Sequence, residues 1–329
     1  MPERANERTA YHNGRFVPER EVLVPFRDRG FLYGDAAFDT TRTFRHEPFR
    51  LREHVERLYR SLKVLRIDPG VGPAEMIAVT EEVLARNRHL LGPDDDYWVS
   101  QRVSRGPRAV SGEPPERAGA TVIVECAPLP FAERARLFRD GIRVVVPATR
   151  RTPPDALTPR AKTHNYLNLV LAEQEAHRVD PEAWAVLLDA HGNLCEGLGS
   201  NIFLVRDGTL LTPRERLVLP GVSRRTVVEL AARLGIPCDE RDLDLYDAHT
   251  ADEVFLTSTS LCLCPVVSVN GGPVGAGGEG PVWGQVTRRL AEAYRDLVGC
   301  DFVAQYLRHL RSEQGSCPGP STTWTRPRS

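Results

Sequence analysis

Three short segments follow one another in the second half of the chain, and their order constrains its fold more than any other feature. The first, residues 160–167, places Lys162 among apolar and aromatic neighbours. The second, residues 195–203, carries Glu196 ahead of small residues and an expected strand. The third, residues 219–225, has a glycine directly before an expected helix. We therefore expect a fold that brings an amine, a carboxylate and a helix N-terminus to a common ligand.

Each segment taken alone is weak, because most lysines and glutamates are solvated and glycine often precedes a helix. Lysines are scarce in this chain, however, and desolvation would lower the pKa of Lys162 toward that of a nucleophile. Glu196 is suited to holding a pyridinium nitrogen protonated. Backbone N–H groups of Gly221, Val222 and Ser223 at a helix start can bind a phosphate. Together the three segments predict pyridoxal 5'-phosphate as cofactor.

In this order the segments closely resemble those of class IV (fold type IV) pyridoxal-phosphate enzymes. These include branched-chain aminotransferases, D-amino-acid aminotransferases, (R)-amine transaminases and aminodeoxychorismate lyases. The resemblance extends from about Tyr11 to about Leu297. It implies a two-domain α+β fold, with a smaller N-terminal α/β domain and a larger C-terminal domain of largely antiparallel sheet with helices.

Local patterns give the expected domain boundaries. The small domain spans residues 11–127, a proline-containing linker spans 128–138, and the large domain spans 139–311; the polar ends, 1–10 and 312–329, are expected to be disordered. Apolar residues at spacings of four and three predict an amphipathic helix over 51–65. Ser223 is expected to cap a second helix over 224–234.

The resemblance assigns roles to single residues. It implies that Lys162 forms the internal aldimine with the cofactor and relays a proton between the substrate Cα and C4′. Glu196 faces the pyridine nitrogen and Leu219 packs on the ring. The remaining implied cofactor contacts are Arg57, Tyr166, Gly221, Val222, Ser223 and Thr259.

Residues of the implied substrate pocket depart from the branched-chain pattern. Arg42 keeps an arginine of that pattern and is expected to bind a substrate carboxylate, whereas Thr40 replaces a glycine and is typical of the lyases. Ser100 stands where branched-chain enzymes commonly carry an arginine. Arg105 and Arg108 are either an alternative carboxylate clamp or solvated loop residues. The predicted substrate-binding residues are Phe38, Thr40, Arg42, Trp98, Arg105 and Ser260.

The sequence therefore predicts an aminotransferase that moves an amino group from an amino acid, with branched-chain L-amino acids leading, to a 2-oxo acid such as 2-oxoglutarate by a ping-pong mechanism. Transamination of D-amino acids or (R)-amines is the first alternative. Elimination of pyruvate from aminodeoxychorismate is the rival reaction, and a non-catalytic homologue is the remotest reading.

Composition excludes several other classes. Forty-three Lys and Arg balance forty-four Asp and Glu, which argues against nucleic acid and anionic membranes as partners. The chain has no apolar run of membrane-spanning length and no apolar signal core at its start, so we expect a cytoplasmic enzyme. Its seven cysteines form no disulfide framework, and Cys262 and Cys264 are too close together for a zinc site, so no metal is expected. The expected partners are the small-molecule donor and acceptor, and a second copy of the chain in a homodimer or higher homo-oligomer.

Overall fold

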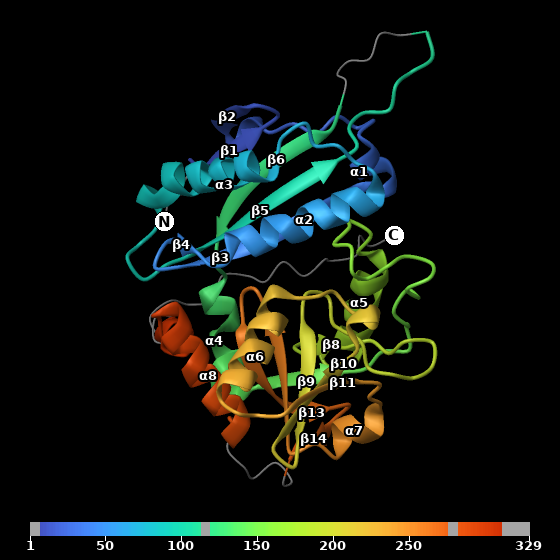
Figure 1. Cartoon of the computed structure of the whole chain (residues 1–329), viewed down its shortest axis with the longest axis vertical. Coiled ribbons are helices and arrows are strands. Elements are labelled where there is room, and N and C mark those ends of the chain that lie inside the picture. Colours follow the sequence, from blue (N-terminus) through green and yellow to red (C-terminus); the bar gives the residue numbers. More distant parts are fainter. Residues whose placement is uncertain (1–6, 113–118, 276–281, 311–329) are drawn as a thin grey trace, which may run out of the picture.

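The computed structural model describes residues 7–112, 119–275 and 282–310. These residues form two parts, each built on its own β-sheet and stacked one above the other in Figure 1. The chain passes from the first sheet to the second through the segment between β6 and β7. A two-domain α+β fold is thus observed.

The first part contains a six-stranded sheet in the order β2-β1-β6-β5-β3-β4. Every pair in it is antiparallel, so this part is α+β rather than the expected α/β arrangement. Its strands are β1 (Thr9–His12), β2 (Arg15–Pro18), β3 (Ala36–Phe44), β4 (Glu47–Pro48), β5 (Tyr97–Ser104) and β6 (Thr121–Pro128). Its helices are α1 (Arg29–Tyr33), α2 (Leu51–Leu65) and α3 (Pro73–Asn87), with 3₁₀ turns η1 (Glu19–Glu21) and η2 (Arg88–Leu90).

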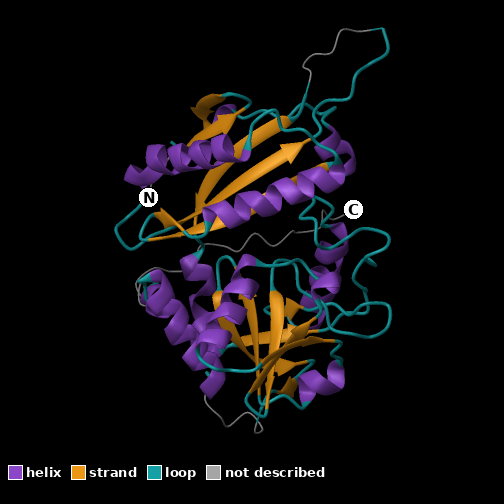
Figure 2. Cartoon of the chain, viewed as in Figure 1, coloured by secondary structure: helices purple, strands orange, loops and turns teal. Residues whose placement is uncertain are grey.

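Helices α2 and α3 lie together on this sheet, as Figure 2 shows. The helix expected over 51–65 is confirmed with both bounds, because its apolar stripe of Leu51, Val55, Leu58 and Leu62 is buried against the strands.

The second part contains an eight-stranded sheet in the order β11-β10-β9-β12-β13-β7-β8, with β14 beside β13. Its centre is antiparallel, while β10 with β11, β13 with β7 and β7 with β8 are parallel pairs. The strands are β7 (Ile142–Val145), β8 (Trp184–Ala185), β9 (Asn201–Arg206), β10 (Thr209–Pro213), β11 (Cys238–Arg241), β12 (Glu253–Ser258), β13 (Cys262–Val269) and β14 (Gly272–Pro273). The helices are α4 (Phe131–Asp140), α5 (Leu167–Val179), α6 (Val222–Arg233), α7 (Leu245–His249), α8 (Gln285–Val298) and α9 (Phe302–Arg308), and η3 (Glu215–Leu217) is a 3₁₀ turn.

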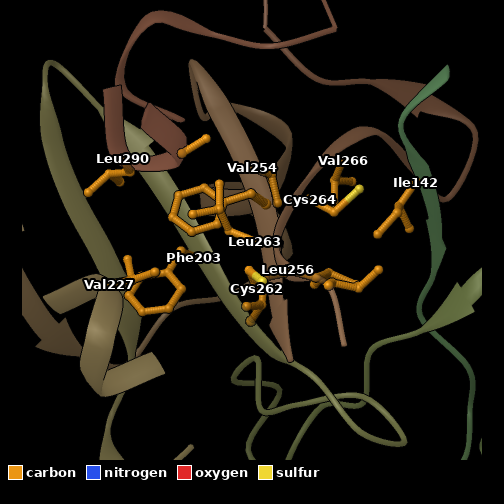
Figure 3. Close-up of a cluster of buried hydrophobic side chains, with 14 of the residues drawn as sticks. Ile142, Phe203, Val227, Val254, Leu256, Cys262, Leu263, Cys264, Val266 and Leu290 are labelled. Atoms are coloured by element: carbon orange, nitrogen blue, oxygen red, sulfur yellow. The ribbon is translucent and has the colours of Figure 1, made fainter. Parts of the chain in front are cut away.

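The core of the second part lies between this sheet and helices α6 and α8 (Figure 3). Phe203 of β9 and Phe255 of β12 are register partners and stack with ring centroids 5.1 Å apart. Cys262 and Cys264 are buried free thiols in this core, which is the ordinary environment of a small apolar side chain.

Three local expectations need correction. Thr9 and Ala10 are not disordered, because they pair with β2 in strand β1; residues 1–6 and 312–329 lie outside the described residues. Most of the expected linker, 128–138, is the first two turns of helix α4, whose apolar residues Phe131 and Phe138 are anchored in the core. Helix α6 begins at Val222, with Gly221 as its N-cap in place of the expected Ser223.

The boundaries proposed for the two domains stay a prediction.

None of the helices in the described ranges is both long and apolar enough to span a membrane.

We expect Phe255→Ala to lower the free energy of unfolding by about 3–5 kcal/mol, because it leaves a cavity beneath a fully buried stacked ring. Urea denaturation followed by circular dichroism measures this loss. Val64→Ala, on the exposed side of α2, is the matched control and should change stability by no more than about 0.5 kcal/mol. A loss below about 1 kcal/mol for Phe255→Ala would contradict the importance of this stack.

Candidate active site

The backbone around Lys162 is fixed by the first part of the molecule, although Lys162 belongs to the loop between β7 and α5. The N–H of Phe38 donates to the carbonyl of Lys162 at 3.0 Å, and the N–H of His164 donates to the carbonyl of Ala36 at 2.9 Å. The N–H of Lys162 donates to Ser61 Oγ of α2 at 2.9 Å. The lysine loop thus pairs with β3 as a short extra strand, which holds the amine between the two parts.

The amine of Lys162 points into a cavity and has one hydrogen-bond partner there among the described residues. Its Nζ donates to Tyr166 Oη at 2.9 Å and lies 4.5 Å from the ring centroid of Phe38. Tyr166 precedes helix α5 and lines the same cavity. The three-residue spacing between the lysine and this tyrosine therefore still brings the hydroxyl to the amine.

Glu196 is buried in the wall of this cavity. Its Oε2 accepts the N–H of Leu219 at 2.8 Å, and its Oε1 accepts both Nε and Nη2 of Arg151 at 3.1 and 3.0 Å. Burial raises the pKa of Glu196, while Arg151 and the Leu219 N–H act in the opposite direction. Such a carboxyl group is held in one orientation and is suited to a hydrogen bond with a ring nitrogen.

The N-terminus of helix α6 forms another part of the wall. Gly221, Val222 and Ser223 line the cavity, and no side chain in the described ranges caps the first N–H groups of the helix. Ser223 Oγ instead donates to the carbonyl of Ser258 at 2.9 Å. A Cβ at Gly221 would lie 2.2 Å from Asn201 Oδ1, so only glycine permits this close approach. Free N–H groups and the positive end of the helix dipole suit a phosphate.

Arg57 lies at the same cavity and is oriented by two buried side chains. Its Nε and Nη2 donate to the two carboxylate oxygens of Asp39, each at 2.8 Å, and its Nη1 donates to the carbonyl of Pro220 at 3.1 Å. His54 Nδ1 lies 2.7 Å from Asp39 Oδ1. Burial alone would raise the pKa of Asp39, but Arg57 and His54 hold it well below its ordinary value. Arg57 is thereby fixed as a cation beside the start of α6.

Two hydroxyl groups in this cavity wall have no partner within the described part of the chain. They are Ser200 Oγ and Thr257 Oγ1, and both atoms are buried. Buried hydroxyl groups normally find an acceptor or donor, so they fit a polar ligand. An amine, a carboxyl group, an arginine and a helix N-terminus around one cavity are the contacts that the aldehyde, the ring nitrogen and the phosphate of pyridoxal 5'-phosphate require. Leu219 and Thr259 line the same cavity, and their contacts with the cofactor stay a prediction.

A second cavity of about 370 Å³ adjoins the first and shares Lys162, Tyr166, Ser258 and Thr259 with it. Strands β3 and β5 supply one wall, where Thr40 Oγ1 and Ser100 Oγ lie 2.9 Å apart. The Thr259 hydroxyl donates to the carbonyl of Thr40 at 3.3 Å. Four of the predicted substrate residues line this cavity: Phe38, Thr40, Trp98 and Ser260.

Arg42 and Arg105 are not among the residues that line it, and both assignments need correction. Arg42 shares a face of β3 with Thr40, but α9 and Ser260 cover it. Its guanidinium donates to the carbonyls of Thr43 and Ser260 and to Gln305 Oε1, and the residue is 2% exposed. Arg105 is engaged with both oxygens of Asp35, at 2.6 and 3.0 Å.

Arg108 likewise lies outside both cavities; its Nη1 donates to Tyr33 Oη at 3.3 Å.

Sequence reasoning missed three charged residues of the site: Asp39, Arg151 and Arg134, the last of which lines the second cavity. Asp39 lies inside the stretch that holds Phe38, Thr40 and Arg42, and its place before Thr40 on a strand could have indicated a buried carboxylate. Arg151 and Arg134 gave no such signal, because both occur in arginine-rich segments where a solvated side chain is the usual outcome.

We expect Arg151→Met to lower the free energy of unfolding by about 3 kcal/mol, because it leaves the buried Glu196 carboxylate without its cation. The double variant Arg151→Met/Glu196→Gln should recover most of this loss, since no charge is then unpaired. Urea denaturation of the single and double variants measures both effects. Arg143→Met, which breaks an exposed pair with Asp180, is the control and should cost at most about 1 kcal/mol. Failure of the double variant to recover stability would contradict the coupling.

Comparison with known proteins agrees with this geometry. Residues 36–269 match the family described as Amino-transferase class IV. A relative from Methanocaldococcus jannaschii, provisionally named a branched-chain-amino-acid aminotransferase, is 36% identical over 288 residues, which are 87% of this chain and 95% of the relative. The branched-chain amino acid aminotransferase of Escherichia coli superposes with a TM-score of 0.79 at 30% identity, covering 89% of this chain and 95% of the other. Another solved branched-chain amino acid aminotransferase, complexed with N-(5'-phosphopyridoxyl)-L-glutamate, superposes at 0.78 with the same identity and coverage. The chain therefore belongs to the class IV aminotransferases, enzymes that depend on pyridoxal phosphate.

Proposed function

We propose that this aminotransferase uses branched-chain L-amino acids as donors and a 2-oxo acid such as 2-oxoglutarate as acceptor, in two half-reactions. The observation that carries the proposal is the position of the Lys162 amine where the two cavities meet. The names of the relatives support the donor class. Phe38, Trp98, Trp184 and Leu198 give the second cavity apolar walls suited to a branched aliphatic side chain.

The residues divide the work of the reaction. When bound, the cofactor withdraws electrons from the bonds at the substrate Cα. Lys162 Nζ would remove the proton from Cα of the donor in the first half-reaction and supply the proton at Cα of the product amino acid in the second, and Tyr166 Oη, at 2.9 Å, orients that amine. Glu196 would hold the ring nitrogen. Arg57 and the start of α6 would hold the phosphate, so the cofactor would stay in place when substrates exchange.

The structure gives the rival lyase reaction no added support. Thr40 is the residue that suggested the lyase reaction. Its hydroxyl group is hydrogen-bonded to Ser100 Oγ in the cavity wall. Its backbone carbonyl also accepts the Thr259 hydroxyl. Both contacts of Thr40 are therefore with the wall of the pocket. Transamination is the reaction we propose.

Lys162→Ala should lower transamination by roughly 10²–10⁴-fold or more, because the group that moves the proton is lost. Glutamate formed from 2-oxoglutarate and leucine, isoleucine or valine measures this rate. The chain has two lysines, Lys63 and Lys162. After borohydride reduction of the loaded enzyme, mass spectrometry should therefore find the pyridoxyl label on the Lys162 peptide. Lys63→Ala is the control and should keep full activity; label at Lys63, or pyruvate release from aminodeoxychorismate without transamination, would contradict the proposal.

We also propose that the enzyme is a homodimer, on the basis of an exposed apolar segment at residues 23–33. Leu23, Phe26 and Phe31 are 73%, 69% and 74% exposed, and Val24, Leu32 and Tyr33 of the same segment are exposed as well. Several large apolar side chains exposed within one short segment favour burial against a partner.

Light scattering should therefore give twice the chain mass of 36.7 kDa. Leu23→Ser/Phe26→Ser should shift the particle toward the monomer, whereas Val179→Ser, exposed at the end of α5, should not. A monomeric wild type would contradict this assembly.

The cytoplasm is the compartment that we propose. The six cysteines in the described ranges are all free thiols, which is typical of a reducing environment. Recovery of these cysteines as disulfides from the source cells would contradict it.

A further inference from the structure

The second cavity contains a cation that the reaction described above does not use. Three positively charged side chains line this cavity: Lys162, Arg102 and Arg134. Lys162 is bonded to Tyr166, and Arg102 lies 3.3 Å from a Glu125 oxygen. Arg134, like Lys162, has no carboxylate within ion-pair distance among the described residues, but unlike Lys162 it has no part in the reaction proposed above.

Arg134 is nevertheless held firmly in place. It lies on α4 between the core residues Phe131 and Phe138. Its Nη1 donates to Ser260 Oγ. Its guanidinium carbon lies 4.8 Å from the Trp98 ring centroid and 5.6 Å from that of Trp184. Two indole rings and one hydroxyl fix the guanidinium but do not neutralise it.

The partial burial of Arg134 has an electrostatic consequence. Loss of water around it lowers the pKa of its guanidinium, and the neighbouring Glu133 offsets this effect only in part. An arginine keeps its charge even so, because its ordinary pKa is above 12. A partly desolvated cation that lines an open cavity is stabilised when an anion enters, and a planar guanidinium fits a carboxylate.

We propose that Arg134 binds the α-carboxylate of the amino acid and 2-oxo acid substrates. The inference rests on the proposed function and names the residue that recognises the substrates. It also accounts for Ser100, whose short side chain carries no charge on β5. The only arginine of β5 that lines the cavity, Arg102, lies 3.3 Å from a Glu125 oxygen, whereas helix α4 supplies Arg134 without a carboxylate partner among the described residues.

The position of Ser260 selects the α-carboxylate over a carboxylate at the far end of a substrate. Ser260 follows Ser258 and Thr259, which line both cavities. Arg134 is hydrogen-bonded to Ser260 and therefore lies next to the shared wall. The α-carboxylate is attached to the reacting carbon, so it must also lie beside that wall. Every donor and acceptor of the reaction carries this group, which one arginine can serve in both half-reactions.

Binding of an unreactive acid tests the proposal without turnover. The probe is 4-methylvalerate, which has the carbon skeleton and carboxylate of leucine but no amine, and its neutral amide is the reference. Titration calorimetry on the holoenzyme should show that Arg134→Met weakens binding of the acid by roughly ten- to a hundred-fold and leaves binding of the amide within about three-fold. Arg134→Lys should restore part of the affinity. Arg139→Met, on the same helix but exposed and paired with Asp140, removes the same charge and should change neither.

Half-reactions identify which carboxylate is bound. Arg134→Met should lose roughly ten- to a hundred-fold in kcat/KM for both leucine and glutamate. The same variant should change much less with 3-methylbutylamine, which is leucine without its carboxylate. A loss confined to glutamate would overturn the assignment in favour of the distal carboxylate, and equal losses for the amine would overturn it in favour of a structural role.

The two proposals fail in different ways. A wild type that binds 4-methylvalerate through Arg134 but transaminates none of the branched-chain amino acids would refute the donor class and leave Arg134 in its role. A wild type that transaminates leucine while Arg134→Met binds the acid unchanged would refute the role of Arg134 alone. If Arg134→Met fails to fold, the same comparisons with Arg134→Lys decide, because full affinity and full selectivity in that variant would overturn a planar carboxylate contact.

Discussion

The buried pair between Asp39 and Arg57 is the interaction on which the site depends. Asp39 belongs to β3 and Arg57 to α2, and the same guanidinium reaches the carbonyl of Pro220 just before α6. One side chain therefore connects the first sheet, the helix that covers it and the helix of the second part that offers its N-terminus. Burying either charge alone would cost several kcal/mol, so Asp39 and Arg57 are stable in this place only as a pair.

Contacts between distant segments also hold Lys162 and Glu196 in place. The lysine loop pairs with β3 through backbone hydrogen bonds, and Glu196 is held by Arg151 and by the N–H of Leu219. Each of these groups is fixed by a contact from a segment distant in sequence. Such support keeps the amine and the carboxyl group in place without a ligand, so little order has to be gained when the cofactor binds.

The arginines show where sequence reasoning reached its limit. Arg42 was expected in the substrate pocket with Thr40. The two residues do share one face of β3, but that face continues past the edge of the cavity and is covered there by α9. Arg134, in contrast, reaches the cavity from a segment expected to be a linker, because Phe131 and Phe138 turn α4 so that its fourth residue faces the tryptophans. The chemistry of the reaction predicts a site for the substrate carboxylate. The sequence alone could not identify which arginine provides it.

The sequence by itself determined the chemistry of the cofactor cavity and the elements that present it. The spacing of Leu51, Val55, Leu58 and Leu62 was sufficient for α2, because an amphipathic stripe is a local property of the helix. Lys162, Glu196 and Gly221 were identifiable because their neighbours form short local patterns. Only the tertiary structure decided the partners of the charged groups: Arg57 with Asp39, Arg151 with Glu196, Arg105 with Asp35, and Arg134 with no carboxylate among the described residues. The physical reason is that a charge is stabilised by whatever lies within a few ångströms after folding, and residues far apart in the sequence provide those neighbours.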